Sequence, residues 1–505
     1  MIQLIATISL VVFVVVMLLV GIYSTKKAGT VEGFLLGGRG IGPWISAFSY
    51  GTAYFSAVIF IGYAGMFGWT IGTGSILIGL GNAIIGCWLA WIFLAKRTRQ
   101  MTRTLNSRTM PEFFAARYNS RRMKLYSAVI IFVFLVPYAA GVYKGLGTLF
   151  SAIFAGVDPV ICMFIVAALT GIYLVLGGYV ATSTNDFIQG LIMIAGIVAM
   201  VLLLVSRPEV GGFSAAFEKL SAIDPQLTDI TGGSSRNFLI TNIVLTSFGV
   251  WGLPQMVHKY YAIKRESDIK IATTVSTIFA LLIGCGAYFS GSLSRLFIEA
   301  DDKGLPNVVG GFDNVVPSIL IKALADNILS MIVLSVIMIL LLSASMSTLA
   351  AIVLSSSAAV SVDLLRELRP QIKPKRQVFL MRILCVIFIA CSFTFAVADI
   401  SFIVNLMSFS WGVVAGSFIG PFLWGLYAKR ITKAGAWAGM LSGIVVVGTM
   451  LTYYTITVGF ESAKSMAPIF GVSAMAVSFI IVPLVSLFTK KFSEEHNTKV
   501  FQVTE

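Results

Sequence analysis

The chain has 505 residues, of which 57% are hydrophobic and only 11% are charged. A composition this apolar excludes a water-soluble globular protein and indicates a protein solvated by a lipid bilayer. The net charge of +14 does not call for a nucleic-acid partner, because excess Lys and Arg in the loops of a membrane protein set its orientation and contact anionic lipid.

About thirteen segments are long and apolar enough to cross a bilayer, which takes roughly 20 residues. We expect these spans at residues 1–24, 44–70, 74–95, 124–150, 158–178, 186–206, 236–257, 271–298, 328–357, 378–398, 400–427, 433–457 and 467–489. We expect the first span to be retained and not cleaved as a signal peptide, because no basic residue precedes it and Lys26 and Lys27 follow it. The sequence therefore predicts an all-α polytopic membrane protein.

Basic residues cluster in alternate loops of this arrangement. The clusters follow the third, seventh, ninth and eleventh spans, at Lys96, Arg97, Arg99, Arg103, Arg108, Arg117, Arg121, Arg122, Lys124, Lys259, Lys264, Arg265, Lys270, Arg366, Arg369, Lys373, Lys375, Arg376, Lys429, Arg430 and Lys433. All of these loops lie on one side, which the positive-inside rule makes cytoplasmic. We expect an integral protein of the plasma membrane, the inner membrane of a bacterium, with its N-terminus outside and its C-terminus in the cytoplasm.

The sequence argues against an enzyme. The two histidines, His258 and His496, are too few and too far apart for a metal site or a nucleophile–base pair, and the five cysteines lack metal-ligand spacing. The two long segments on the outer side, 207–236 and 299–327, have mixed charge with Gly or Pro and could hold short surface helices. Neither of them has the length of a separate domain.

Two spans depart from plain apolar helix at corresponding positions. The second span contains Ser49-Tyr50-Gly51-Thr52-Ala53-Tyr54-Phe55-Ser56, a run of low helix propensity, and the seventh contains Thr246 to Gln255 with Pro254 inside it. Discontinuous helices in corresponding halves of a chain indicate a transporter binding site, since unwound carbonyls can coordinate a cation and half-helix N-termini can face an anion. Alternatively, the glycines only permit close packing of helices.

Polar groups inside other spans need partners as well. The ninth span carries several hydroxyls between Leu341 and Ala351, and hydroxyls in a membrane either bond back to their own helix or line an ion or solute path. Asp186 opens the sixth predicted span, where it either caps that helix or serves as an ion-exit or second cation site.

The chain resembles the sodium:solute symporter family over all of its predicted spans. The motifs that carry the resemblance are Phe34-Leu35-Leu36-Gly37-Gly38-Arg39, Gly177-Gly178-Tyr179 with Asp186 and Gln189, Gly252-Leu253-Pro254, Met346-Ser347-Thr348-Leu349, and Gly420-Pro421 through Arg430 to Gly435-Ala436. The resemblance implies a LeuT-type core of two inverted five-helix repeats. The first repeat would cover residues 44–206 and the second 236–427, flanked by an extra N-terminal helix and loop at 1–43 and by C-terminal helices and a tail at 433–505.

The resemblance also implies a bound sodium ion between the broken second span and the ninth span. Its ligands would be the carbonyls of Thr52, Phe55 and Ala344 and the side-chain oxygens of Ser347 and Thr348. Some relatives have a second sodium site that uses the counterpart of Asp186 together with further serines. This chain has Ala350 and Ala351 at those serine positions, which argues against a second sodium.

The implied function is sodium-coupled import of a small organic solute by alternating access, and the solute resembles those of pantothenate, monocarboxylate or proline carriers. Proline is weakened as a candidate, because proline carriers have an aspartate where this chain has Tyr54. We expect the solute to contact Gly51, Tyr54, Ser56, Tyr63, Trp251 and Gln255, with Trp411 as a gate residue. A sugar or polyol symporter, a solute sensor and a passive channel are the alternatives, and a monomer is the expected state.

Overall fold

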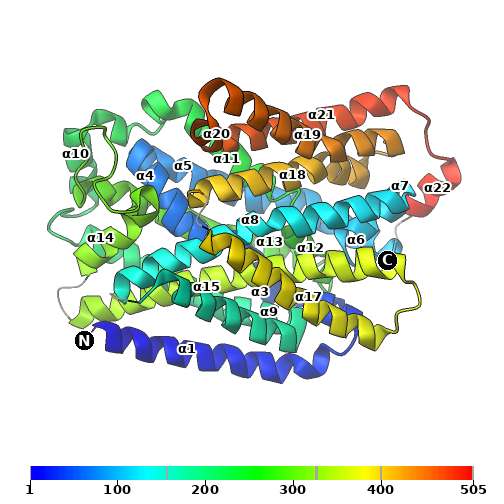
Figure 1. Ribbon diagram of the computed structural model, residues 1–505, viewed down its shortest axis with the longest axis horizontal. Helices are drawn as coiled ribbons and strands as arrows, with labels where there is room; N and C mark the ends of the chain where they lie inside the picture. Colours follow the sequence, from blue (N-terminus) through cyan, green and yellow to red (C-terminus); the bar gives the residue numbers. More distant parts are fainter. Residues whose placement is uncertain (1, 155–156, 325–327, 399–400, 503–505) are drawn as a thin grey trace.

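The computed structural model describes residues 2–154, 157–324, 328–398 and 401–502. Within these ranges the chain is helical, and its only β-type pairings are two isolated bridges. The long helices run side by side, with α1 along one edge of the bundle and α19 and α21 along the opposite edge (Figure 1). The predicted all-α architecture is confirmed.

The first half of the chain contains α1 (Ile2–Ser24), α2 (Val31–Leu36), α3 (Pro43–Tyr54), η3 (Val58–Tyr63), α4 (Ala64–Ile71), α5 (Ile76–Gly81), η5 (Asn82–Leu89), η6 (Trp91–Ala95), α6 (Lys96–Thr104), α7 (Met110–Tyr118), α8 (Arg121–Ile153), α9 (Pro159–Val205), α10 (Phe213–Ile223) and α11 (Arg236–Gly249). The second half contains α12 (Pro254–Ala262), α13 (Asp268–Ser292), η10 (Gly311–Asn314), α14 (Val315–Leu324), α15 (Ile328–Ala358), η11 (Ala359–Leu365), α16 (Arg366–Leu368), α17 (Pro374–Val397), α18 (Ile403–Tyr427), α19 (Lys433–Val458), α20 (Phe460–Ser465), α21 (Ala467–Phe488) and α22 (Glu494–Phe501).

Eleven helical stretches in the described ranges are long and apolar enough to cross a membrane. Two of them, Val58–Thr104 and Pro159–Val205, have 47 residues each, about twice the length of a span. Each is interrupted by a glycine in a left-handed conformation, Gly72 with φ 71° and Gly178 with φ 54°, which other residues adopt only at a cost. Dividing both stretches at these glycines gives thirteen segments, and the segment 58–71 reaches the length of a span only together with α3 before it.

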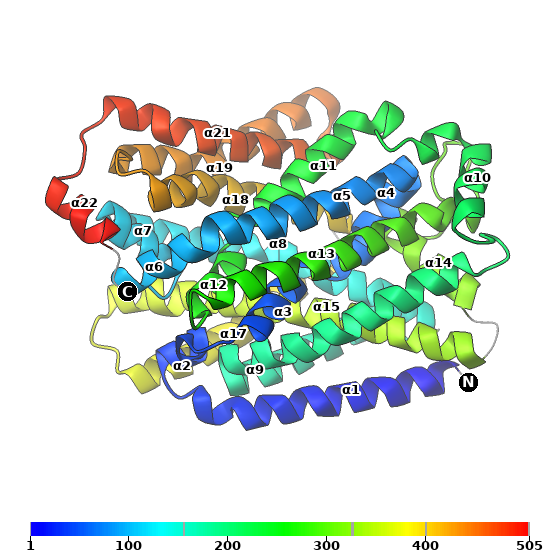
Figure 2. The same ribbon diagram turned by 180° about the vertical axis from the view of Figure 1, so that it is seen from behind.

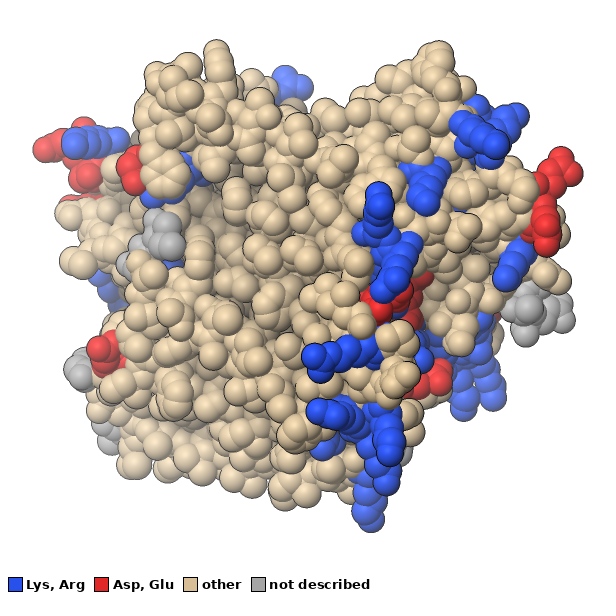
Figure 3. Space-filling model, turned by 45° about the vertical axis from the view of Figure 1, so that its right-hand side comes forward, with Lys and Arg blue, Asp and Glu red and all other residues tan. Residues whose placement is uncertain are grey.

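The two ends of the bundle differ in charge. Lys and Arg side chains gather at one end, which we call the basic end, beside a broad uncharged surface (Figure 3). The basic end carries α6, α7 and α22, whereas the opposite end, called here the far end, carries the start of α1 together with α10 and α14 (Figure 1). The short helices expected in the two long outer segments are therefore present as α10 and α14.

The C-terminal helix α22 docks onto the basic end. The guanidinium groups of Arg97 and Arg117 lie 5.2 and 4.9 Å from the centre of the Phe501 ring, and the Lys429 ammonium lies 5.9 Å from it. His496 Nε2 lies 3.0 Å from the backbone oxygen of Arg117. The tail thus contacts three different parts of the bundle through one aromatic ring and one histidine.

Close backbone contacts hold α13 against α4 and α5. A Cβ placed on Gly68 would lie 2.1 Å from the carbonyl carbon of Gly291, and one on Gly79 would lie 2.6 Å from that of Gly284. Glycines at these four positions therefore let helices approach more closely than any side chain would allow.

One boundary matters for the site. The sequence places the end of the seventh span at residue 257 and Lys259 in a basic loop, but α12 continues to Ala262 and Lys259 is 2% exposed inside the bundle. The prediction of Lys259 as a loop residue is wrong, because Pro254 begins a new helical segment instead of ending the span.

Candidate functional site

The break predicted in the second span is present. α3 ends at Tyr54, Phe55 is extended with φ −104° and ψ 107°, and helical turns resume after Ser56. An extended residue deprives the carbonyls one turn earlier of their usual helical partners. The carbonyls of Thr52 and Ala53 are freed in this way and accept hydrogen bonds from α15.

Two adjacent hydroxyls of α15 meet these carbonyls. Ser347 Oγ lies 2.9 Å from Thr52 O and 3.1 Å from Ala344 O, and Thr348 Oγ1 lies 3.2 and 3.0 Å from the same two oxygens. All four residues are buried. We call these four atoms the oxygen cluster. Closely spaced carbonyl and hydroxyl oxygens are a donor set that suits a hard cation. The structure thus brings together four of the five residues expected around sodium, and the fifth, Phe55, is the extended residue of the break.

The seventh span is broken as well. α11 ends at Gly249 and α12 begins at Pro254. α18 packs against this break, since a Cβ on Gly249 would lie 2.7 Å from the ring of Trp411 and one on Gly252 would lie 2.9 Å from Ala415 Cα. The pair of breaks predicted from the sequence is therefore present, and a tryptophan of α18 covers the second one.

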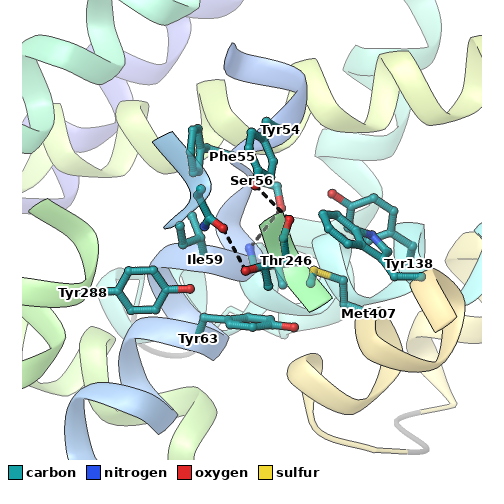
Figure 4. Close-up of a pocket in the computed structure, with 12 residues that line it drawn as sticks. Tyr54, Phe55, Ser56, Ile59, Tyr63, Tyr138, Thr246, Tyr288 and Met407 are labelled. Carbon is teal, nitrogen blue, oxygen red and sulfur yellow. Dashed lines mark hydrogen bonds between the residues drawn. The ribbon is translucent and has the colours of Figure 1, made fainter. Parts of the chain in front are cut away.

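A small cavity of about 20 Å³ lies between these elements. It is lined by Tyr54, Phe55, Ser56, Val58, Ile59 and Tyr63 of the second span, with Asn82, Tyr138, Thr246, Tyr288, Met407 and Trp411 from five other elements (Figure 4). This volume holds about one water molecule, so the cavity is nearly closed in this structure.

The polar groups that line the cavity are uncharged. Tyr54 Oη donates to Thr246 O at 2.8 Å, and Thr246 Oγ1 lies 2.8 Å from Asn82 Oδ1 (Figure 4). Trp411 Nε1 is buried and has no hydrogen-bond partner. Among the described residues that line the cavity, none is acidic or basic. The site therefore offers uncharged polar groups and several aromatic rings to a compact solute without net charge.

The predicted solute residues divide into two groups. Tyr54, Ser56, Tyr63 and the predicted gate Trp411 line the cavity. Gly51, Trp251 and Gln255 do not line it. A Cβ on Gly51 would strike the Phe279 ring at 2.4 Å. Trp251 Nε1 donates to Ile85 O, and the Trp251 ring packs near Phe93 and Phe248. Gln255 is buried in the first turn of α12, directly after the break.

Sequence reasoning missed seven lining residues. They are Val58, Ile59, Asn82, Tyr138, Thr246, Tyr288 and Met407. Thr246 was visible as a hydroxyl in the broken seventh span, and Asn82 as a lone amide in the apolar third span. The remaining ones carry no signal that separates them from ordinary core residues.

Asp186 lies within a helix and not at the N-terminus of one. It is eight residues beyond the turn at Gly178, inside α9, and is 1% exposed. Its Oδ2 accepts a hydrogen bond from Ser49 Oγ at 2.5 Å and lies 3.5 Å from Lys259 Nζ. Lys259 Nζ in turn donates to Ser49 Oγ at 2.7 Å. Asp186 is thus an ion-paired carboxylate in the core, and the capping role considered for it is wrong.

The paired helix breaks and the oxygen cluster agree with the family that the sequence matches. Residues 34–443 match the sodium:solute symporter family. The chain belongs to this family. Its function is therefore sodium-coupled transport of a solute, with sodium as the coupling ion, and the family consists of transporters rather than enzymes.

Relatives match this symporter along nearly their whole length. It is 30% identical to the sodium/proline symporter of Haemophilus influenzae over 94% of this chain and 93% of that protein. It is 29% identical to the osmoregulated proline transporter OpuE of Bacillus subtilis over 96% of this chain and 95% of that protein.

Solved structures support the fold. A Na+-coupled sialic acid symporter in a substrate-bound outward-open state superposes with a TM-score of 0.77 at 17% identity, covering 97% of this chain and 99% of that one. The nucleobase-cation-symport-1 family transporter Mhp1 in a closed conformation gives 0.52 at 15% identity, covering 92% and 97%. The LeuT-type fold expected from the resemblance is confirmed.

Proposed function

We propose that this symporter imports a small amino-acid-like zwitterion with an apolar body, of the proline class, together with sodium. The observation that carries the proposal is the cavity at the two breaks, whose described lining is aromatic and uncharged. Trp411 Nε1 can donate to the solute carboxylate, and the Tyr54, Tyr63 and Tyr138 rings suit an ammonium group. The relatives described above are proline transporters, which favours proline over pantothenate and short monocarboxylates.

The sodium ligands in this proposal are the oxygens of Thr52, Phe55, Ala344, Ser347 and Thr348. Support comes from the oxygen cluster, which joins the end of α3 to the middle of α15. No carboxylate takes part in it, so carbonyl dipoles and hydroxyls would supply the coordination.

Coupling follows from the position of the cluster. Tyr54, Phe55 and Ser56 line the solute cavity, and they directly follow Thr52, whose carbonyl belongs to the cluster. Sodium that holds Thr52 against α15 therefore also positions the solute-binding residues. Sodium and solute then favour the same conformation, which is the differential affinity that coupled transport requires.

The driving force limits accumulation. One sodium ion crossing about 100 mV gains roughly 2.3 kcal/mol, and a tenfold sodium gradient adds about 1.4 kcal/mol. Together these could concentrate a zwitterion roughly 500-fold at one-to-one coupling. For a monoanion the voltage contribution cancels and about tenfold remains, so a zwitterion makes better use of the same gradient.

Orientation and repeats complete the proposal. The basic end faces the cytoplasm by the positive-inside rule, which puts the N-terminus outside and the C-terminal helix α22 inside. The breaks after Tyr54 and Gly249 occupy corresponding positions in the repeats 44–206 and 236–427, and the remaining segments flank this core. The transport unit is a monomer, since one chain holds both the oxygen cluster and the cavity.

Uptake into proteoliposomes tests the function. Labelled proline, pantothenate, a short monocarboxylate and a hexose are offered with and without an inward sodium gradient. We expect accumulation of proline or a related zwitterion that needs sodium and collapses when the gradient is dissipated. Accumulation of the hexose alone would instead indicate a sugar symporter, and uptake that never exceeds equilibrium would indicate a passive channel.

A further inference from the structure

A buried charged cluster lies one helical turn from the oxygen cluster. It consists of Asp186, Lys259 and Ser49, all at most 2% exposed, from α9, α12 and α3. Ser49 precedes Thr52 by three residues in α3, and Asp186 precedes Gly190 by four residues in α9. A Cβ on Gly190 would lie 3.2 Å from Thr52 Cγ2, so the two helices run side by side at this level. Figure 2 shows α3 between α9 and α12 there.

Several oxygens in and beside this charged cluster have no hydrogen-bond partner and could coordinate a cation. Asp186 Oδ2 is used by Ser49 and Lys259, but Asp186 Oδ1 is buried without a hydrogen-bond partner. Thr52 Oγ1 and Tyr179 Oη, on the same two helices, are also buried and unpartnered. A carboxylate with neighbouring hydroxyls is a donor set for a hard cation such as sodium.

The cation that this carboxylate faces is part of the chain. Lys259 Nζ lies 3.5 Å from Asp186 Oδ2, 2.7 Å from Ser49 Oγ and 5.2 Å from the centre of the Tyr179 ring. A carboxylate removed from water needs a positive partner, and the ammonium supplies it. A sodium ion on the same oxygens would meet the ammonium at short range in a medium of low dielectric constant, where like charges repel strongly.

We propose that the Lys259 ammonium is a resident cation in the place of a second sodium ion, so that each transport cycle carries one sodium. The inference rests on the proposed function, because it fixes the stoichiometry of the same sodium-coupled cycle. It concerns Asp186, which is not a ligand of the oxygen cluster. It also gives Asp186 a role that does not require it to bind sodium in the wild-type protein.

The proposal predicts a gain of binding. Replacing Lys259 by methionine removes the charge but keeps an unbranched side chain of similar length. Asp186 Oδ2, Asp186 Oδ1 and Ser49 Oγ then become available to sodium. We expect Lys259→Met to bind two sodium ions where the wild type binds one, with the Hill coefficient for sodium rising from about 1 toward 2.

One measurement is the binding of radioactive sodium to the purified protein. The other is the sodium-to-proline ratio in proteoliposomes, obtained from the voltage at which the net proline flux reverses. Lys259→Arg keeps the positive charge and should retain one sodium. The double variant Asp186→Asn/Lys259→Met removes both charges and should return to one sodium, and it avoids the uncompensated carboxylate that could prevent Lys259→Met from folding.

Two results would overturn the inference: two sodium ions per cycle in the wild type, or one sodium ion in a folded Lys259→Met protein. Two sodium ions in the double variant would also contradict it, since Asp186 could not then be the new ligand. Failure of the proposed function looks different. In that case no proline flux is seen in any variant, while sodium binding still distinguishes the wild type from Lys259→Met.

Discussion

Loss of the two hydroxyls of the oxygen cluster should weaken sodium binding steeply. Ser347 and Thr348 each lie within 3.2 Å of Thr52 O, so each would contribute one oxygen to the same ion. A hydrogen-bond-type contact to a charged group is worth about 1.5–3 kcal/mol, which corresponds to roughly 10- to 150-fold in the dissociation constant. We therefore expect Ser347→Ala to raise the sodium concentration for half-maximal effect by that factor, and Ser347→Ala/Thr348→Ala to abolish sodium-stimulated uptake.

The assay follows the melting temperature of the purified protein against sodium concentration, with potassium as the reference ion, alongside sodium-dependent proline uptake. Thr348→Ser keeps the hydroxyl and should behave like the wild type. Ser335→Ala is the matched control, because Ser335 is a buried serine of the same helix that bonds only back to Met331 O. Wild-type sodium dependence in the folded double variant would refute the assignment of Ser347 and Thr348 as sodium ligands.

Three further changes test other parts of the structure. Trp411→Phe removes the unpartnered indole N–H, so the KM for proline should rise about tenfold while the sodium dependence is unchanged. An unchanged KM would show that the indole N–H of Trp411 does not bind the solute. Gly291→Val introduces a side chain at a position where even a Cβ would lie 2.1 Å from Ala64 O, so we expect no monodisperse protein by size-exclusion chromatography. A folded variant would contradict the close packing. Phe501→Ala removes the ring that meets three cations, so trypsin should cut faster at Lys490; equal cleavage rates would show that α22 is not held by this contact.

The spans and the first break were predictable because they depend on composition and local propensity. A lipid environment leaves few alternatives to an apolar helix, and the run from Ser49 to Ser56 is a poor helix former. The pairing of Ser347 and Thr348 with Thr52 came from the family resemblance, since spacing alone does not show which helix faces those hydroxyls.

Three residues lie elsewhere than the sequence suggested, for two different reasons. Trp251 and Gln255 were expected in the cavity because they flank the second break. The helix is interrupted between Gly249 and Pro254, so helical periodicity cannot be carried across the break to predict where these side chains point. Lys259 was read as a loop residue because basic side chains normally mark the ends of spans. Its partner Asp186 is 73 positions away, and no local pattern connects the two residues.

The glycine contacts between α13 and the α4–α5 hairpin bear on how this symporter changes shape. Where backbone touches backbone, as at Gly68 and Gly291, there are no side chains to change rotamer and absorb a sliding motion. The part of the broken second span that follows Ser56 must then travel with α13 as a rigid body. Motion is left to the two-residue joint at Phe55 and Ser56, so the joint that lines the solute cavity would also be the hinge of the transport cycle.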